Sequence, residues 1–369
     1  LTDDAVRSLR VRAQRLAGHR RARTATAVAA VTAVPAQSTP AARLAIRARS
    51  AIPTAAGVDR ACARGTVVRT WAMRGTLHAL AATDVRWIVN LLGPVFAAAG
   101  RRRRAQLGLD DATCERALAA IQSVLAGSGP LTRADLVARL ADEGVALDSG
   151  TQAPAHLVSY AAMRGLVCRG PDRARDEPTY VLLEDWVPPA PGPDGDEALA
   201  ELARRYLAGH APAAEPDLRA WSGLPAAAAR RAFALIADEL TQVRLDDAAA
   251  YVPSTMDLDP PGCPVVRLLG AFDPYLLGYR SRELALDAGH AKRIQAGGGI
   301  VHPAVLVDGR IVGTWRLDRR GPSRRLRVEP FGPLPKGSRG PLEAEAEDIG
   351  RFVGAPVSLD LGRWGHAGG

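Results

Sequence analysis

The feature that most limits how this chain folds is a change of hydrophobic period after residue 65. Residues 57–64 have the composition of a short helix, whereas residues 66–73 show the period of two that is typical of a strand. Arg74 and Gly75 mark a turn, and residues 76–80 supply the matching return strand. Helices followed directly by a β-hairpin are typical of a winged helix.

A polar break near the N-terminus is the first candidate for chemistry. Residues 24–34 are rich in alanine and valine and predict a buried helix, and residues 40–49 predict an amphipathic one that Pro40 opens. Between them the backbone is limited by Pro35. The pattern fits a reactive site and equally an ordinary loop, and its polar side chains are Gln37, Ser38 and Thr39.

Two further helices are predicted in this region. The first covers residues 5–17 and is preceded by acidic residues, and the second is strongly apolar and runs from an N-cap at Thr83-Asp84 to about Ala99. A run of arginines follows the second helix and would complement the dipole at its C-terminus. The run fits a phosphate-binding surface and equally a solvated charge run; it comprises Arg101, Arg102, Arg103 and Arg104.

An internal repeat predicts more units of the same kind. Residues 129–136 have the same layout as residues 211–218, and each segment follows one helix and opens another. Further helices and strand-like stretches come behind both copies, so three tandem winged-helix units are expected. Residues 188–195 are rich in proline and glycine, which predicts a linker between the second and third units.

Beyond residue 252 the sequence predicts strands. Asp308-Gly309 between alternating apolar residues is a strong hairpin signal, and a helix is expected at residues 342–353. The predicted strands cover residues 265–269, 304–307, 310–317 and 325–328. A turn in this region carries a cluster of arginines, which fits a DNA-contacting tip or a soluble loop: Arg319, Arg320, Arg324 and Arg325.

The predicted fold class is therefore α+β and mostly α. Three tandem winged-helix units precede a β-rich, barrel-like C-terminal domain. The predicted boundaries are 1–106 for the unit with the polar break, 107–187 for the second unit, 188–195 for the linker, 196–258 for the third unit and 259–369 for the β-rich domain with its basic hairpin.

Composition narrows the class of partner. Lys and Arg outnumber Asp and Glu by 48 to 39, which gives a net charge of +9, and aromatic residues make up only 5% of the 369 residues. A basic surface favours a polyanion because each neutralised phosphate releases condensed counterions. The alternative is that a genome rich in G and C raises the arginine content everywhere.

Metal, disulfide and membrane chemistry are not predicted. The four cysteines are widely spaced and the seven histidines never fall at metal-ligand spacing, so no metal or other cofactor is expected. No stretch reaches the roughly 18 apolar residues of a membrane span, and no signal-peptide pattern is present. These observations predict a cytoplasmic protein that does not bind membranes.

Several segments together resemble the winged-helix DNA glycosylase family, which includes the azinomycin-resistance glycosylase and bacterial crosslink-repair relatives. The resemblance covers most of the chain in the same order. It is carried by residues 69–78 (RTWAMRGTLH), 204–207 (RRYL), 217–223 (DLRAWSG), 272–279 (FDPYLLGY) and 307–315 (VDGRIVGTW).

The resemblance implies a monomeric enzyme that removes bulky N-alkylated purines, including interstrand crosslinks, from double-stranded DNA, as repair or as self-resistance to a genotoxic natural product. The family's catalytic element is Gln, an apolar residue, then Gln or Asp. Residues 35–37 match it by position with Gln37 as the second polar residue, but the first glutamine is replaced by Pro35. The resemblance also makes Arg69, Arg74 and His78 contacts to DNA; the alternative for His78 is a buried ring bonded to a backbone carbonyl.

Chemistry supports Gln37 as the catalytic residue, with Ser38 and Thr39 as possible auxiliaries. An N7-alkylated purine leaves as an already cationic base, so the remaining task is to place a water against the developing oxocarbenium carbon. A neutral amide orients this water but does not take its proton, which predicts labile, charged substrates. The alternative is a non-catalytic winged-helix protein that recognises or sequesters modified DNA. Lysines occur only at Lys292 and Lys336, in expected loops, which argues against Schiff-base chemistry.

Overall fold

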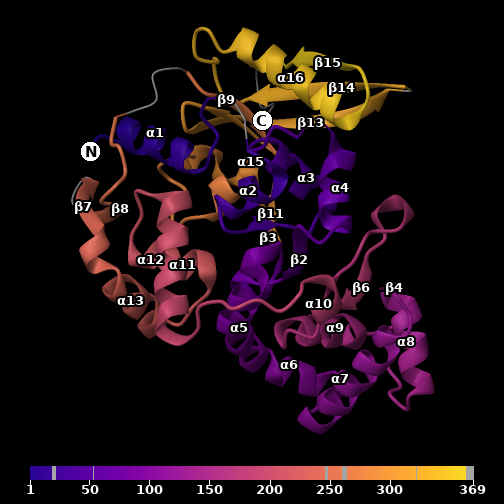
Figure 1. The fold of residues 1–369 in the computed structure, drawn as a ribbon. Coiled ribbons are helices and arrows are strands. Elements are labelled where there is room, and N and C mark those ends of the chain that lie inside the picture. The colour runs from indigo at the N-terminus through magenta and orange to yellow at the C-terminus, as the bar shows by residue number, and fades with distance from the viewer. Residues whose placement is uncertain (19–21, 53, 246–247, 260–263, 321, 363–369) are drawn as a thin grey trace.

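The computed structural model describes residues 1–18, 22–52, 54–245, 248–259, 264–320 and 322–362, except for the side chains of Arg319 and Arg320. Mixed helices and strands form the fold, and helix accounts for about 48% of it. Helix α1 (Asp3–Ala13) lies between the third helical unit and the C-terminal sheet (Figure 1). Val11 of α1 and Leu16, which follows the helix, pack in the core of the C-terminal domain. They hold the N-terminal segment against this domain.

The first unit confirms the predicted hairpin and places a short strand before it. The predicted helix over residues 24–34 is wrong in its extent, because it ends at Ala29 and Thr32 adopts a positive φ of 63°. The chain then extends for two residues and pairs with the hairpin. The elements are α2 (Thr24–Ala29), β1 (Val34–Pro35), α3 (Thr39–Arg47), α4 (Ala55–Ala63), β2 (Val67–Trp71), the 3₁₀ turn η1 (Met73–Gly75) and β3 (Leu77–Ala81).

The second unit repeats this order after a long connecting helix. A helix, a two-residue strand, two more helices and a hairpin follow each other as in the first unit. The elements are α5 (Ala82–Ala99), α6 (Arg101–Gln106), α7 (Asp111–Ala126), β4 (Leu131–Thr132), α8 (Arg133–Asp142), α9 (Ala153–Met163), β5 (Val167–Arg169), η2 (Ala174–Asp176), β6 (Thr179–Leu182) and α10 (Leu183–Trp186).

One six-stranded sheet joins the first two units. Its strand order is β1-β3-β2-β5-β6-β4, and all neighbours are antiparallel. The junction is the pairing of Arg69 in β2 with Arg169 in β5. The two hairpins therefore lie side by side in one sheet.

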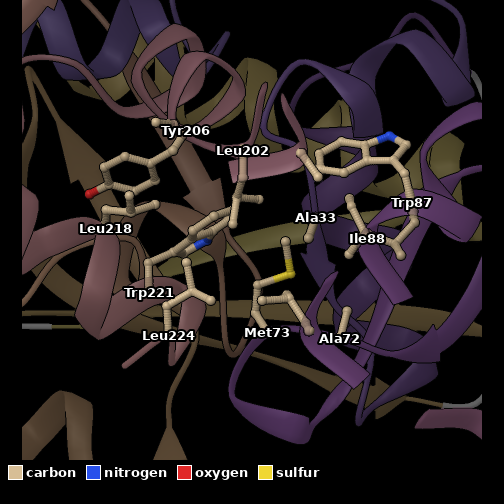
Figure 2. Close-up of a cluster of buried hydrophobic side chains, with 14 of the residues drawn as sticks. Ala33, Ala72, Met73, Trp87, Ile88, Leu202, Tyr206, Leu218, Trp221 and Leu224 are labelled. Atoms are coloured by element: carbon tan, nitrogen blue, oxygen red, sulfur yellow. The ribbon is translucent and has the colours of Figure 1, made fainter. Parts of the chain in front are cut away.

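The third unit shares a hydrophobic core with the first. Ala213 forms an isolated bridge with Tyr251, in the place that β1 and β4 hold in the other units. Figure 2 shows Leu202, Tyr206 and Trp221 of this unit facing Met73 and Ile88 across one buried cluster. The elements are α11 (Gly195–His210), α12 (Glu215–Ser222), α13 (Ala226–Leu235), η3 (Ala237–Glu239), β7 (Leu240–Leu245) and β8 (Ala248–Pro253).

The C-terminal domain is built on a curled half-barrel sheet of order β15-β14-β13-β12-β9. Apolar residues lie on both of its faces: Leu268 and Val305 pack under α16, and Leu269 and Leu306 pack toward α1. The elements are β9 (Val266–Leu269), α14 (Pro274–Leu277), η4 (Ala288–His290), α15 (Ala291–Ile294), β10 (Gln295–Gly297), β11 (Ile300–Val301), β12 (Ala304–Val307), β13 (Arg310–Arg320), β14 (Ser323–Pro330), α16 (Arg339–Val353) and β15 (Val357–Leu361).

Two predictions around α5 are wrong. The helix begins at Ala82 with Ala81 as its N-cap, and Asp84 is a buried residue of the first turn that faces Arg205 at 3.4 Å. The arginine run does not end α5, because Gly100 separates the two helices and the arginines form the start of α6. The dipole of α5 therefore does not explain the run.

Within the described residues, no helix combines the length and apolar character that a membrane span requires. The same residues contain no group of three or more His, Cys, Asp or Glu side chains that converge to hold a metal ion. Cys62, Cys114 and Cys168 are free thiols, and Cys263 lies outside the described residues.

Candidate functional site

Gln37 is an exposed side chain on a firmly held backbone. Pro35 and Ala36 before it are buried, and the N–H of Ala36 donates to the carbonyl of Leu77 at 2.9 Å. Directly after it, Ser38 is the N-cap of α3, and its Oγ accepts from the N–H of Ala41 at 3.4 Å. Gln37 is thus fixed between the last hydrogen bond of a strand and the first turn of a helix, with its amide free to meet a ligand.

Gln37 follows the strand that pairs with His78. Val34 lies opposite Ala79 and Pro35 opposite His78. Strand β1 ends at Pro35, and the chain bends at Gln37 and Ser38 before α3 begins. Pro35 and His78 are both buried, whereas Gln37, two residues further along the chain, is exposed.

His78 is buried and neutral. Its exposed fraction is 1%, and its Nδ1 lies 2.9 Å from the carbonyl oxygen of Thr76. Burial lowers the pKa of His78 to about 3, which outweighs the opposite effect of this hydrogen bond. A carbonyl only accepts, so Nδ1 must carry the proton and Nε2 is left as an acceptor. The structure matches the alternative of a buried histidine bonded to a backbone carbonyl.

Two other residues of the first hairpin, Arg69 and Arg74, were expected to contact DNA. They differ in whether a carboxylate already pairs with the guanidinium group. Arg69 is 7% exposed, and its guanidinium holds Asp172 at 2.5 and 2.9 Å and the carbonyl of Gly170 at 2.8 Å. Arg74 occupies the turn with a φ of 54° and donates from Nη1 to the carbonyl of Trp221 at 2.5 Å. Arg74 is half-buried, and no carboxylate among the described residues pairs with it. Arg69 is committed to an internal ion pair, and Arg74 is not.

The arginines of α6 separate into one structural residue and three surface residues. Arg104 is buried, with its guanidinium 4.0 Å from the ring centre of Tyr160. Arg101, Arg102 and Arg103 are exposed; Arg101 pairs with Asp111, and Arg103 donates to Gln152 at 2.9 Å. Arg102 differs from its two exposed neighbours in that its guanidinium has no hydrogen-bond or ion-pair partner among the described residues.

The basic hairpin of the C-terminal domain is formed by β13 and β14. Arg319 pairs with Arg324 and Arg320 with Ser323 along the backbone. The side chains of Arg319 and Arg320 lie outside the described residues, and those of Arg324 and Arg325 are half-buried. The predicted tip thus lies at the end of the longest strand pair of the sheet.

Sequence reasoning missed two arginines that line a cavity beside the third unit. Arg280 and Arg282 line a cavity of about 640 Å³ between the start of α12 and residues 280–295. The irregular segment that carries them has no hydrophobic period that would bring it into a motif. Only the fold reveals that this segment meets the start of α12.

Residues 272–279, one of the segments that carry the family resemblance, contribute side chains to the core. Tyr275 and Tyr279 are buried, and their hydroxyls donate to the carbonyls of Gly309 and His210. Asp273 caps α14 and forms a fully buried pair with Arg49 at 2.7 Å. The two tyrosines therefore contribute to core packing, and Asp273 has a structural role in a buried ion pair.

Known proteins resemble this chain in sequence and in fold. Residues 28–352 match the model of the DNA glycosylase AlkZ-like family. The chain is 29% identical over 329 residues to the "Interstrand DNA cross-link repair glycosylase" of Streptomyces sahachiroi, which covers 85% of this chain and 86% of that protein.

A solved structure is similar over nearly its whole length. Streptomyces sahachiroi DNA glycosylase AlkZ superposes with a TM-score of 0.81 at 26% identity, covering 97% of this chain and 99% of that chain. The matched residues include the polar break and all four parts of the fold. The chain therefore belongs to the AlkZ-like DNA glycosylase family, whose enzymes are hydrolases that act on N-glycosyl bonds.

Proposed function

We propose that this DNA glycosylase hydrolyses the N-glycosidic bond of N7-alkylated or bulky purine adducts, including interstrand crosslinks, with Gln37 as the residue that orients the attacking water. The observation that carries the proposal is the placement of Gln37: an exposed amide on a backbone fixed by the Ala36–Leu77 hydrogen bond and by the Ser38 cap. The relative from Streptomyces sahachiroi is named a cross-link repair glycosylase, which supports the same class of substrate.

The chemistry suits a neutral residue. The bond between C1′ and N9 breaks, and its electron pair moves to the purine and cancels the charge that N7-alkylation created. The water oxygen then bonds to C1′ and loses its proton to solvent, because an amide accepts a hydrogen bond but not a proton. Gln37 positions the water and does not remove its proton, so the rate depends on a nucleobase that leaves readily.

Because His78 is neutral, it adds no positive charge near Gln37, where the oxocarbenium ion of the substrate would develop. A cationic imidazole opposite Pro35, two residues before Gln37, would oppose the oxocarbenium ion that develops at C1′. We infer that His78 shapes the electrostatics of the site from a buried position, while Ser38 and Thr39, both half-buried, flank the water as auxiliary groups.

The proposed DNA surface combines arginines from three parts of the fold. Arg74 lies at the first hairpin turn, Arg102 and its neighbours Arg101 and Arg103 lie on α6, and the C-terminal hairpin adds further arginines. We leave Arg69 and Arg104 out of this surface, because Asp172 and Tyr160 already engage their guanidinium groups. The hairpin residues proposed are Arg319, Arg320, Arg324 and Arg325.

The proposed domain organisation follows the recurring order of elements. Each of the first three units has a helix, a short extended segment, two helices and a hairpin, which supports three tandem winged helices over residues 1–106, 107–187 and 196–258, with residues 188–195 as linker and residues 259–369 as the sheet domain. We propose that the enzyme acts as a monomer on double-stranded DNA, either in repair or in self-resistance to a DNA-alkylating natural product.

The test is base release from a defined duplex. A duplex that contains one 7-methylguanine, or one interstrand crosslink, is incubated with the protein and then heated in alkali, which cleaves the strand at abasic sites. The expected result is strand cleavage that disappears in Gln37→Ala. Binding without cleavage on every adduct would instead identify a non-catalytic protein that recognises or sequesters modified DNA.

Borohydride distinguishes the monofunctional mechanism from a lyase. A lyase forms a Schiff base between an amine and C1′, and reduction traps the protein on DNA. We expect no trapped adduct, because hydrolysis by water leaves no covalent intermediate. A trapped adduct that persists in Gln37→Ala would contradict the proposed role of water.

A further inference from the structure

The turn of the second hairpin is fixed to the first unit by two ion pairs. Arg69 of β2 holds Asp172 at the base of the turn, at 2.5 and 2.9 Å. Arg43 of α3 holds Asp176 at the tip of the turn, with 2.7 Å between Nη2 and Oδ1, and its Nε donates to Asp59 of α4, also at 2.7 Å. The Arg43 side chain is 18% exposed, so this contact is partly shielded from solvent. The tip therefore keeps a defined position relative to α3.

The first and second hairpins end in the same type of turn, and both have an arginine at its first central position. Arg74 and Gly75 have φ values of 54° and 65°, and Arg175 and Asp176 have φ values of 62° and 59°. Turns with two such residues favour Asn and Gly, because most side chains are strained in the left-handed region. An arginine that adopts this conformation in both hairpins points to a use for its side chain.

The two arginines differ in what their guanidinium groups contact. Arg74 is half-buried and donates to the carbonyl of Trp221. Arg175 is exposed, and its side chain has no hydrogen-bond or ion-pair partner among the residues that the structure describes. Other exposed arginines, such as Arg164 and Arg231, are paired with carboxylates. Arg175 therefore offers all of its donors to a ligand.

The acids beside Arg175 do not pair with it. Asp176 is already engaged, and Arg173 of the same turn pairs with Asp135 of α8 at 3.1 Å. Glu177 is exposed and forms no ion pair within the described part of the chain, and its carbonyl accepts from the N–H of Arg173 at 2.7 Å across the base of the turn. A free cation on a fixed turn binds a phosphate with little loss of conformational entropy.

The third hairpin has the opposite charge in its turn sequence. Asp246 and Asp247 lie between β7 and β8 in the sequence and outside the described residues. Two carboxylates repel a phosphate. Of the three hairpins, the second is thus the one whose turn combines an exposed arginine with a fixed backbone.

The tip of this turn is tied to the helix that follows Gln37. Ser38 caps α3, and Arg43 lies in the second turn of this helix. Two residues of chain and four helical steps separate the Cα atoms of Gln37 and Arg43 by no more than about 14 Å. A phosphate held beside this helix would therefore belong to DNA near the attacked nucleotide.

We propose that the turn of the second hairpin is a contact for the DNA backbone, in which Arg175 binds a phosphodiester group near the lesion and Asp176 is a positioning residue that fixes this contact through Arg43. The proposal rests on the proposed function in that the ligand is damaged DNA, and it adds a DNA contact on the second hairpin. The planar guanidinium matches two phosphate oxygens. Asp176 acts on Arg175 as its neighbour at the tip, whereas Asp172 fixes only the base of the turn.

The experiment measures DNA binding and stability in variants of the tip. A duplex of about 24 base pairs carries one 7-methylguanine on a 2′-fluorinated sugar, which resists hydrolysis. Dissociation constants are measured over a range of salt concentrations for the wild type, Arg175→Gly and Arg175→Gln, with Arg339→Gln of α16 as a control whose side chain is 79% exposed. Glycine adopts a φ of 62° without strain, so the stability of Arg175→Gly to urea should match that of the wild type.

The expected result is a rise in the dissociation constant of about tenfold for both Arg175 variants. The slope of log K against log salt should fall in magnitude by about 0.9 in these variants, and Arg339→Gln should keep the wild-type values. Wild-type affinity and slope in both Arg175 variants would overturn the proposal. A loss of stability in Arg175→Gly together with wild-type binding would also refute it, because the side chain would then serve the fold alone.

Asp176→Asn tests the positioning role. Removal of a negative charge from a DNA-binding face strengthens binding in general, but release of the turn from Arg43 should weaken it by about threefold. The double variant Arg175→Gly/Asp176→Asn should bind no worse than Arg175→Gly, because the two residues act through one contact. Tighter binding in Asp176→Asn, or additive losses in the double variant, would contradict the positioning role.

Neutral methylphosphonate linkages locate the contact. Placed at successive single positions, they should weaken wild-type binding at about one or two positions within about ten base pairs of the lesion, which is one turn of the duplex, and have no further effect on Arg175→Gly. Equal penalties at every position in both proteins would exclude a phosphate contact at Arg175. Binding is measured on an uncleavable duplex, so failure of the proposed glycosylase activity leaves this test intact, and failure of this test leaves base release intact.

Discussion

Pro35 lies directly opposite His78 in the antiparallel pair of β1 and β3. Cβ atoms of such opposed residues are about 4.5–5.5 Å apart, so a longer side chain at position 35 would reach the imidazole. Strand β1 is at the edge of its sheet, where a proline, which has no N–H, is tolerated. The residue that departs from the expected catalytic element is thus accommodated by its place in the sheet.

Pro35→Gln should therefore give a folded protein with added activity. The new amide can donate to the acceptor Nε2 of His78 and place a second polar group beside Gln37. We expect faster release of 7-methylguanine and measurable release of less labile bases, quantified by single-turnover kinetics. Pro35→Leu serves as the apolar control; an equal gain in that variant would show that loss of the proline ring, rather than the amide, is responsible.

Gln37→Ala should abolish most base release and leave stability unchanged. The side chain is exposed, so its loss should alter the free energy of unfolding by less than about 0.5 kcal/mol. Loss of water positioning should lower the single-turnover rate by about 100-fold. Gln37→Glu, which accepts a proton and stabilises the oxocarbenium ion, should retain activity and broaden it toward uncharged bases. A Gln37→Ala protein with wild-type rates would remove this residue from the mechanism.

Arg69→Met should destabilise the fold without changing DNA binding. The Arg69–Asp172 pair joins β2 to the connection between β5 and β6 of the second hairpin, and both side chains are at most 10% exposed. Removal of one partner from such a pair costs about 3–5 kcal/mol because the other charge remains buried. Urea unfolding measures the loss, and the double variant Arg69→Met/Asp172→Leu should recover much of it. A lower salt dependence of DNA binding in Arg69→Met would contradict this structural role.

Arg102→Gln should weaken binding only to long duplexes. Helix α5 has 18 residues and carries the chain about 27 Å from the end of β3 to α6. That length equals about eight base pairs of DNA at about 3.4 Å each. We expect weaker binding and a salt slope lower by about 0.9 on a lesion duplex with ten or more flanking base pairs on each side. An identical effect on a duplex with about four flanking pairs would place Arg102 near the lesion instead.

The stability of the protein should fall as the pH drops below about 6.5. Burial lowers the pKa of His78 and of His210 to about 3, whereas histidine in an unfolded chain titrates near 6.5. Between these values the unfolded state binds protons that the folded state does not, so stability rises with pH in this window. Each histidine contributes up to about 1.4 kcal/mol per pH unit.

Urea unfolding of wild type and His210→Phe between pH 7.5 and pH 4.5 checks this dependence. Phenylalanine keeps the stacking against Tyr206, whose ring centre is 4.7 Å away, and removes the titrating group. The pH dependence of the variant should be shallower than that of the wild type. Parallel curves would show that other groups govern the acid sensitivity.

Local sequence patterns predicted many helices and strands of the fold. They did not predict which distant strands pair in one sheet. The hairpin around Arg74 and Gly75 follows from strand period and turn residues, which are short-range properties. The pairing of Arg69 with Arg169, which merges two units into one sheet, depends on strand edges 100 residues apart that leave no periodic signal. The sequence predicted the end of α5 at Ala99, directly before Gly100. It did not predict that the arginines after Gly100 form a new helix, in which Arg104 packs on Tyr160.

The sequence singled out Gln37 as the candidate residue, but it did not predict the contacts that position Gln37. Gln37 was identified by its position in a polar break, but the hydrogen bond to Leu77 that fixes it comes from another part of the chain. Arg282 had no signal at all, because an arginine in an irregular segment looks like any solvated charge. Its cavity forms only where residues 280–295 meet the start of α12.

The shared six-stranded sheet also limits how this chain can be divided or recombined. A cut near residue 106 would expose the edge of β2, with its unpaired N–H and C=O groups, and would leave Asp172 without Arg69. The first two units therefore form one structural piece, and an exchange of modules between relatives should preserve folding only at junctions that spare this sheet, such as the proline-rich segment before α11.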